Sequence, residues 1–204
     1  MRTFLTFWLT HVTKRIYYSV TTAVAVMKLF FWGINAGSGN QFKGIPILKC
    51  KPGSRIQIGN NNIFNSTEQS NLVGINRRCI LATHRNAAML SIGNGCGFSG
   101  TTIGAFEKIE IGDNVICGAN TLITDSDWHG IKPDERAGIF AASKPVKIER
   151  NVWLGVNAVV LKGVTIGENT VIAANAVVTK SIPANVIAGG NPCVVIKNII
   201  PANA

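Results

Sequence analysis

Carboxylates are absent from the first third of this 204-residue chain. Glu68 is the first acidic residue, and eight Lys and Arg residues precede it. The 137 residues after position 67 are nearly balanced, with twelve basic and ten acidic side chains. We therefore expect the N-terminal part to favour anionic partners such as a membrane surface or phosphate groups. Because no nucleic-acid-binding motif accompanies this charge, we expect no nucleic acid partner.

Long hydrophobic runs are also missing. The longest stretch without a charge before Lys28 runs from Ile16 to Met27, which is only twelve residues. This length is too short to span a bilayer. Charges close to the N-terminus and His11 also interrupt any hydrophobic segment of a signal peptide. We expect neither a transmembrane helix nor a secretory leader.

The chain has few cysteines, and their spacing forms no pattern. No C-x-x-C pair occurs, the number is odd, and no spacing recurs, which argues against both a disulfide framework and a zinc cluster. We expect reduced thiols in a cytoplasmic protein that requires no metal. The five cysteines are Cys50, Cys79, Cys96, Cys117 and Cys193.

Aromatic residues make up only 7% of the chain, whereas glycine occurs 21 times. This composition predicts many tight turns and a core of small and β-branched side chains. An apolar content of 47% with 15% charged residues is typical of a globular protein, and the length fits a single domain.

The first 35 residues predict one or two amphipathic helices, because apolar side chains recur at helical spacing. Two interpretations remain open: the segment packs on its own domain or a neighbouring subunit, or residues 1–33 contact an anionic membrane peripherally. The predicted apolar stripe contains Leu5, Trp8, Leu9, Val12, Ile16, Val20, Val24, Met27 and Phe31.

From residue 148 onward the sequence repeats with a period of six. The hexads IERNVW, LGVNAV, VLKGVT, IGENTV, IAANAV and VTKSI follow one another, and IGDNVI, CGANTL and ITDSDW form an earlier block. A helix would repeat every 3.6 residues and a paired strand every 2, so six fits neither. The leading positions are Ile111, Cys117, Ile123, Ile148, Leu154, Val160, Ile166, Ile172 and Val178. The fifth positions of the later block are Val152, Ala158, Val164, Thr170, Ala176 and Ile182.

This period predicts an all-β fold, a left-handed parallel β-helix in which three hexads make one triangular turn. The leading aliphatic side chain points inward, the small fifth residue lies beside the corner, and Gly, Asn or Asp makes the turn. We expect a helical segment over residues 1–35, the β-helix over 36–190 with an excursion at 128–146, and a tail over 191–204.

Four ordered motifs add specificity to the repeats. They read IGNGCGFSGTTIGAFEKIEIGDNVICGAN, TDSDWHGIKPDER, VWLGVNAVVLKGVTIG and IAANAVVTKSIPANVIAGGNP. Over roughly residues 56–198 the chain resembles the hexapeptide-repeat acyltransferases, in the branch of maltose, galactoside and polysaccharide O-acetyltransferases. The resemblance implies a homotrimer with active sites between subunits, acetyl-CoA as donor and a saccharide acceptor, in cell-surface polysaccharide biosynthesis.

His129 is the predicted general base. The hexads stop near Trp128 and resume near Ile148, so His129 begins an excursion from the coil. A neutral imidazole can take a proton from a sugar hydroxyl, and the resemblance assigns this role to His129. Asp127 is the better candidate to orient the imidazole, while Asp125 is placed on the acceptor side; solvated loop acids or a D-x-D-x-H metal site are the alternatives. Gly130 departs from the family pattern, in which proline usually follows the histidine.

For Ser99 and the CoA-binding candidates the resemblance supplies the assignment, whereas Glu107, Asp125 and Trp128 are candidates by their place in the sequence. On the acceptor side these are Ser99, Glu107, Asp125 and Trp128. Ser99 either binds the acceptor hydroxyl or only turns the coil. The CoA-binding candidates are Trp153, Val156, Ala174, Thr179, Lys180 and Lys197. Val194 stands where some relatives have arginine, so fewer phosphate contacts are expected. Trp153 as a hydrophobic corner cover and Lys180 as a solvated charge are the alternatives.

Other functions fit the sequence less well. IAANAVV and GGNP also resemble the antibiotic acetyltransferases, but TDSDWHG fits that branch less well. Serine is a further alternative acceptor. A metal-dependent lyase with the same coil needs three histidine ligands, and the three histidines here lie far apart in sequence. A non-catalytic scaffold would not require His129. The acceptor itself cannot be identified from the sequence.

Overall fold

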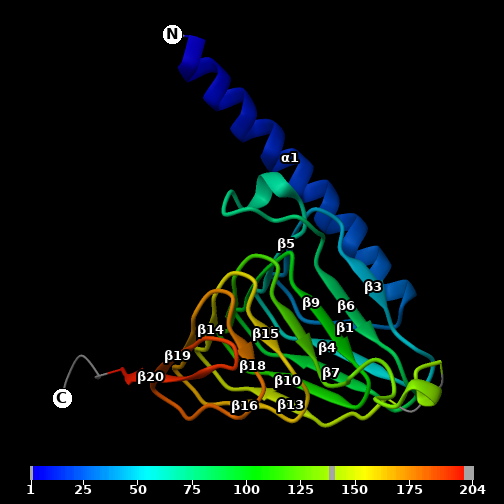
Figure 1. Cartoon of the computed structure of the whole chain (residues 1–204). Coiled ribbons are helices and arrows are strands. Elements are labelled where there is room, and N and C mark those ends of the chain that lie inside the picture. Colours follow the sequence, from blue (N-terminus) through cyan, green and yellow to red (C-terminus); the bar gives the residue numbers. More distant parts are fainter. Residues whose placement is uncertain (1, 138–140, 200–204) are drawn as a thin grey trace.

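A computed structural model describes residues 2–137 and 141–199, with the side chains of residues 2–8 left undescribed. One long helix precedes a three-sided coil of parallel strands (Figure 1). Successive strands enter three sheets in rotation, so each turn of the chain adds one strand to every sheet. This architecture is the predicted left-handed parallel β-helix.

The three sheets are the three faces of the coil. Sheet A contains β1 (Asn35–Ala36), β4 (Arg55–Ile58), β7 (Met89–Ile92), β10 (Lys108–Ile111), β13 (Val146–Ile148) and β16 (Thr165–Ile166). Sheet B contains β2 (Gln41–Lys43), β5 (Ile63–Asn65), β8 (Gly97–Ser99), β11 (Ile116–Cys117), β14 (Trp153–Leu154), β17 (Val171–Ile172), β19 (Val186–Gly189) and β20 (Val194–Asn198). Sheet C contains β3 (Ile47–Lys49), β6 (Ile80–Thr83), β9 (Thr102–Ala105), β12 (Leu122–Thr124), β15 (Val159–Val160) and β18 (Val177–Val178).

All strand pairs are parallel except β19–β20, where the chain folds back on sheet B after the last turn. Two short 3-10 helices, η1 (Glu68–Ser70) and η2 (Pro133–Glu135), lie on excursions from the coil. The corners are named here by the sheets they join: A–B, B–C and C–A. The larger excursions leave the B–C corner after β5 and the C–A corner after β12.

The interior confirms the hexad pattern. Every leading residue and every fifth residue named from the repeats is buried. The interior near the N-terminal end differs from the rest because it is aromatic. Phe42, Phe64 and Phe98 are fully buried and stack along sheet B, with ring centroids 4.8 and 5.0 Å apart. Their order follows the registers of β2, β5 and β8.

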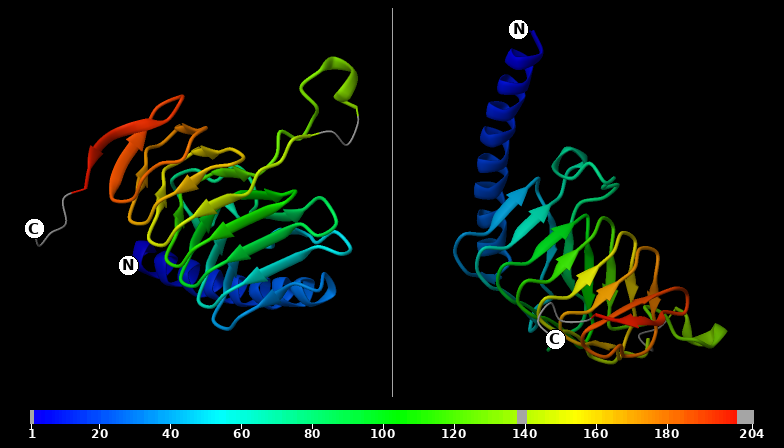
Figure 2. Two further views of the ribbon diagram at one scale, coloured as in Figure 1. Left: turned by 90° about the horizontal axis from the view of Figure 1, so that it is seen from below. Right: turned by 90° about the vertical axis from the view of Figure 1, so that its left-hand side faces the viewer.

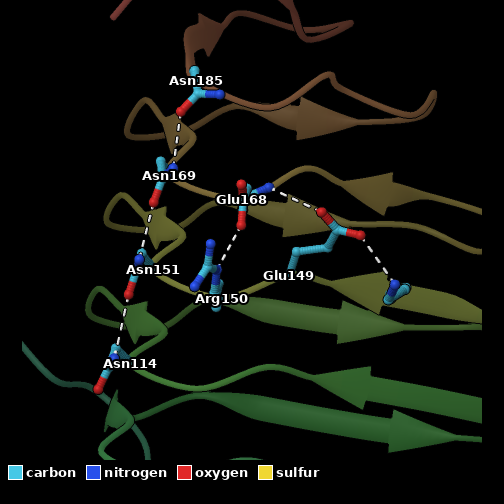
Figure 3. A network of polar contacts seen from close by, with 8 residues as sticks. Asn114, Glu149, Arg150, Asn151, Glu168, Asn169 and Asn185 are labelled. Atoms are coloured by element: carbon cyan, nitrogen blue, oxygen red, sulfur yellow. Dashed lines mark hydrogen bonds and ion pairs between the residues drawn. The ribbon is translucent and has the colours of Figure 1, made fainter. Parts of the chain in front are cut away.

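Asparagine makes the turn at the A–B corner. Asn114, Asn151, Asn169 and Asn185 adopt φ of 57°, 59°, 59° and 59°, a left-handed conformation that asparagine tolerates better than most residues. Their side-chain amides form a ladder along the coil, each donating to the next over 3.3, 2.9 and 2.9 Å (Figure 3). The same residue type therefore sets the turn and links successive turns.

Helix α1 (Arg2–Phe31) lies across the N-terminal end of the coil (Figures 1 and 2). The predicted helix is confirmed as a single element, but the face it uses for packing is not the predicted apolar stripe. Thr21, Ala25 and Leu29 are buried against the coil. From the predicted stripe, Leu9, Val12, Ile16, Val20, Met27 and Phe31 are exposed, and Val24 is half-buried. The side chains of Leu5 and Trp8 lie outside the described residues.

Threonine hydroxyls explain why the face of α1 that contains Thr21 packs on the coil. The first turn of the coil has no preceding turn to satisfy its backbone groups. The Thr21 hydroxyl donates to the Phe42 carbonyl at 2.6 Å and accepts from the Gly44 N–H at 3.2 Å. The Phe42 N–H donates to the Thr22 hydroxyl at 2.9 Å. The helix therefore caps the open end of the coil by hydrogen bonding as well as by packing.

None of the described helices is long and apolar enough to cross a membrane.

Candidate active site

The segment between β12 and β13 leaves the C–A corner as a two-legged loop that projects from the coil (Figure 2). Its legs are joined where Ser126 pairs with Ser143 in an antiparallel bridge. Arg85 fastens the returning leg, because its guanidinium donates to the Ala141 carbonyl at 2.7 Å and to the Ser143 hydroxyl at 3.2 Å. Arg85 was missed in the sequence, since nothing in its neighbourhood marks it. Residues 138–140 of the predicted excursion lie outside the described part of the chain.

His129 lies on the outgoing leg of this loop and is exposed. Its Nδ1 lies 3.0 Å from the Arg136 carbonyl oxygen. A carbonyl oxygen can only accept, so this contact places the proton on Nδ1 and leaves Nε2 as an unprotonated acceptor in the neutral ring. Nε2 is the nitrogen that a general base would use. The loop therefore presents an imidazole in the tautomer that proton abstraction requires.

Asp127 does not orient the imidazole in this chain. Its carboxylate forms an ion pair with Lys162, which lies between β15 and β16 on the same corner. The Asp127 N–H donates to the Ala142 carbonyl at 3.1 Å. Asp127 therefore links the loop to the next turn of the coil, and the orienting role predicted for it is performed by the Arg136 carbonyl.

Asp125 was predicted to lie on the acceptor side, but the structure buries it inside the coil corner. It is 0% exposed, and its carboxylate accepts from the N–H groups of Phe106, Glu107 and Lys108 at 2.7, 2.8 and 2.7 Å. A carboxylate buried with this many donors holds the turn between β9 and β10 and has no surface for a substrate. Although Asp125, Asp127 and His129 alternate in the sequence, their side chains have different partners and do not form one site.

Trp128 packs against the coil beneath the loop. Its indole N–H donates to the Thr124 hydroxyl at 2.9 Å, and its ring meets those of His84 and Phe106 edge-on at 4.7 and 5.0 Å. Burial lowers the pKa of His84, and the positive charge of Lys49 lowers it further, against the opposing effect of Asp125. His84 is therefore a neutral packing partner, and Trp128 anchors the loop while leaving part of its ring exposed.

The departure from proline at Gly130 has a steric explanation. A Cβ at this position would collide with the Glu135 side chain and lie 2.8 Å from the Glu135 carbonyl oxygen. The close approach lets the chain return so that Arg136 reaches His129. Glycine here is part of the geometry that orients the imidazole.

The other acceptor-side candidates lie on two corners. Glu107 is exposed on the C–A corner, near the base of the loop. Ser99 is buried on the B–C corner, where its hydroxyl accepts from the side-chain amides of Asn65 at 3.1 Å and Asn71 at 3.0 Å. Asn65 and Asn71 were not predicted. They line a hollow of about 420 Å³ with Ser99, on a different corner from His129.

The CoA candidates are also divided between corners. Trp153 is exposed on sheet B, and Val156 and Ala174 occupy successive turns of the B–C corner. Lys197 is exposed on β20, beside β19. Thr179 and Lys180 instead follow β18 on the C–A corner. One chain therefore does not bring His129 together with Ser99, Trp153 or Val156.

No group of three or more His, Cys, Asp or Glu side chains lies close enough to hold a metal ion within the described residues. His84 and His129 belong to the same corner but have separate partners, Trp128 for the first and the Arg136 carbonyl for the second.

The thiols should be poor nucleophiles. Burial is the main cause that raises the pKa of Cys79, Cys117 and Cys193 and raises that of Cys96 to about 11. Because a raised pKa keeps a thiol protonated at pH 8, we expect Cys50, the half-buried one, to react first with Ellman's reagent. The other four should react only on unfolding. Rapid labelling of more than one thiol in native protein would contradict this expectation.

The chain is similar to known transferases over part of its length. The family model for the bacterial transferase hexapeptide (six repeats) matches residues 145–180. The galactoside O-acetyltransferase of Lactococcus lactis is 47% identical over 91 residues, which cover 45% of this chain and 44% of that protein. The galactoside O-acetyltransferase of Escherichia coli is 43% identical over 91 residues, with the same two shares.

Among solved structures, a serine-to-threonine mutant of AntD, an N-acyltransferase from Bacillus cereus in complex with dTDP and coenzyme A, matches with a TM-score of 0.65. The match covers 86% of this chain and 89% of that one at 20% identity, which supports the fold alone. The chain spans less than half the length of the two galactoside O-acetyltransferases, 44% in each case. Taken together, the six-residue repeat, the three-sided coil and these similarities relate the chain to the hexapeptide-repeat acetyltransferases, most directly over residues 145–180.

Proposed function

We propose that the protein is an O-acetyltransferase that moves the acetyl group of acetyl-CoA to a hydroxyl of a saccharide, in the biosynthesis of cell-surface polysaccharide. The observation that carries this proposal is the His129 imidazole, held by the Arg136 carbonyl with Nε2 left to accept a proton. The two galactoside O-acetyltransferases that match the chain support the reaction type and the saccharide class.

The proposed chemistry is a single direct transfer. Nε2 of His129 takes the proton of the acceptor hydroxyl as its oxygen attacks the thioester carbonyl carbon. The tetrahedral intermediate then collapses, the carbon–sulfur bond breaks, and the CoA thiolate leaves and takes the proton back from the imidazolium. No acetyl-enzyme is needed, which agrees with the buried, protonated thiols.

The oxyanion of the tetrahedral intermediate needs a donor, and we place this role on the Val156 N–H. In the described part of the chain this N–H donates no hydrogen bond to the protein, whereas the Val156 carbonyl accepts from Asn175. A backbone N–H fixed in a coil corner would stabilise developing charge without reorganising.

The division of candidates between two corners supports a homotrimer with active sites between subunits. The C–A corner of one subunit would bring Lys180, and the loop that leaves this corner would bring His129, to the neighbour's B–C corner. Ser99 and Val156 lie on that corner, and Trp153 lies beside it on sheet B. Trp153 and Val156 would contact the pantetheine arm and thioester, Ala174 and Thr179 the distal pantetheine and nucleotide, and Lys180 and Lys197 the phosphates. Ser99, Glu107 and the exposed edge of Trp128 would face the acceptor.

The free cysteines favour action in the cytoplasm. The exposed apolar residues of α1 favour a position at the inner face of the membrane. Acetylation of an antibiotic or of serine is the alternative reaction, and a non-catalytic solenoid is the alternative role. A non-catalytic solenoid does not explain why a loop holds His129 in the tautomer of a base. The two matching galactoside O-acetyltransferases favour a saccharide over an antibiotic or serine as acceptor.

Mass spectrometry of acceptor libraries incubated with the protein and acetyl-CoA tests the proposal. We expect one acetyl group on a saccharide hydroxyl and none on the protein after incubation with acetyl-CoA alone. Acetylation of antibiotics or serine, with no acetylation of any saccharide, would overturn the proposed saccharide acceptor in favour of these alternatives. A stoichiometric protein adduct that passes to the acceptor would overturn direct transfer.

A further inference from the structure

The outward face of α1 is apolar and has no partner in the described chain. From Leu9 to Phe31 this face carries no charged side chain. Phe30 and Phe31, at the C-terminal end of the helix, are 80% and 83% exposed. The exposed apolar residues of α1 are Leu9, Val12, Ile16, Tyr17, Val20, Val26, Met27, Phe30 and Phe31.

Two basic side chains of α1, those of Lys14 and Arg15, lie beside this face rather than on it. Lys14 shares the spacing of Tyr18, Thr21 and Ala25, which face the coil, and Arg15 lies on the flank. Together with Lys43 of β2 they line a groove of about 730 Å³ between the helix and the first turn of the coil. The other residues lining it are His11, Tyr18, Ser19, Thr22, Ala23 and Gln41, so the groove contains no carboxylate.

We propose that α1 lies in the plane of an anionic lipid bilayer, with its outward face among the acyl chains and the cationic groove beside the lipid phosphates. An apolar helix face with aromatic residues and flanking basic residues is the pattern of an interfacial helix. The absence of any acid before Glu68 extends the positive charge across the whole N-terminal end of the coil. This proposal is independent of the acetyltransferase activity.

Charge favours lipid over a second copy of the chain as the occupant of this face. Two copies meeting through α1 would bring together two N-terminal ends that each carry basic residues beside the apolar face, which opposes association. An anionic bilayer supplies the opposite charge. Helix α1 lies on the outside of the N-terminal end of the coil (Figures 1 and 2), and the apolar residues of its outward face are exposed, so this face can reach a flat surface.

Co-sedimentation of the full chain with vesicles tests the proposal. Vesicles of phosphatidylcholine alone are compared with vesicles that also contain phosphatidylglycerol, at low salt and at 1 M NaCl. We expect binding to the anionic vesicles only, weakened by high salt because surface charges are then screened. The double variant Ile16→Ser/Val20→Ser should bind about tenfold more weakly, and Lys14→Gln/Arg15→Gln roughly 10- to 30-fold more weakly.

A matched control is available at the other end of the coil. Ile196 is 62% exposed on β20, compared with 61% for Ile16 on α1. Val194→Ser/Ile196→Ser should therefore remove a similar apolar surface and leave vesicle binding unchanged. Circular dichroism and light scattering accompany each variant to confirm that the fold and the oligomeric state are kept.

Three results would overturn the proposal. The first is no binding of the wild-type protein to anionic vesicles. The second is equal binding by the wild-type protein and the Ile16→Ser/Val20→Ser variant. The third is a change of oligomeric state in that variant, since this would assign the face to a second copy of the chain.

Discussion

Replacement of His129 by alanine is expected to lower kcat by about 10²–10⁴-fold and to leave the affinity for CoA nearly unchanged. The side chain lies on a loop outside the coil interior, so its loss removes the proton acceptor without opening a cavity. Steady-state assays of the wild type and the variant measure the loss of kcat, and equilibrium binding of CoA measures the affinity.

Arg136→Ala provides the matched control. His129 is held by the backbone carbonyl of Arg136, and this carbonyl remains when the guanidinium is removed. We expect kcat of Arg136→Ala within about threefold of the wild type. A His129→Ala variant that keeps activity within about threefold would show that another group takes the proton. Loss of CoA binding in the His129→Ala variant would instead show that the loop is structural.

The repeat predicted most of the fold because a period of six residues corresponds to one side of the three-sided coil. Each hexad supplies one side of a triangle, so an aliphatic residue at Ile148, Leu154 or Val160 has only the interior to occupy. The face that α1 uses could not be predicted in the same way. Hydrophobicity selected the stripe through Ile16 and Val20, whereas the coil end required hydroxyl groups for the unpaired backbone of Phe42. Hydrogen-bonding demand therefore outweighed apolar burial there.

The sequence predicted the candidate general base, His129, but not the group that holds its imidazole. His129 is conspicuous because it follows the last hexad before the excursion. The group that orients it is a main-chain carbonyl, and a sequence gives no signal for a backbone group seven residues away. Asp125 looked like a site residue because it is near His129 in sequence. Its carboxylate instead serves the N–H groups of a turn whose residues lie 17–19 positions earlier.

Replacement of Phe64 by alanine is expected to lower the free energy of unfolding by about 3–5 kcal/mol. Phe64 is the middle ring of the stack with Phe42 and Phe98, and it is fully buried. The neighbouring rings cannot close the gap, because parallel ladders fix β2, β5 and β8 at their spacing. A loss of this size is a large share of the roughly 5–15 kcal/mol typical of a folded domain. Denaturant unfolding at equilibrium measures it.

The same substitution should loosen the N-terminal end of the coil more than the rest. Each turn of a solenoid contacts only its neighbours, so a cavity at β5 weakens the turns on which α1 rests. Hydrogen exchange should therefore increase in β2, β5 and the second half of α1, and remain unchanged near β15 and β17. Phe64→Leu, which keeps much of the volume, should lower the free energy of unfolding by less than about 1.5 kcal/mol. A loss below about 1 kcal/mol for Phe64→Ala, or exchange that rises evenly along the chain, would show that the aromatic stack does not hold this end together.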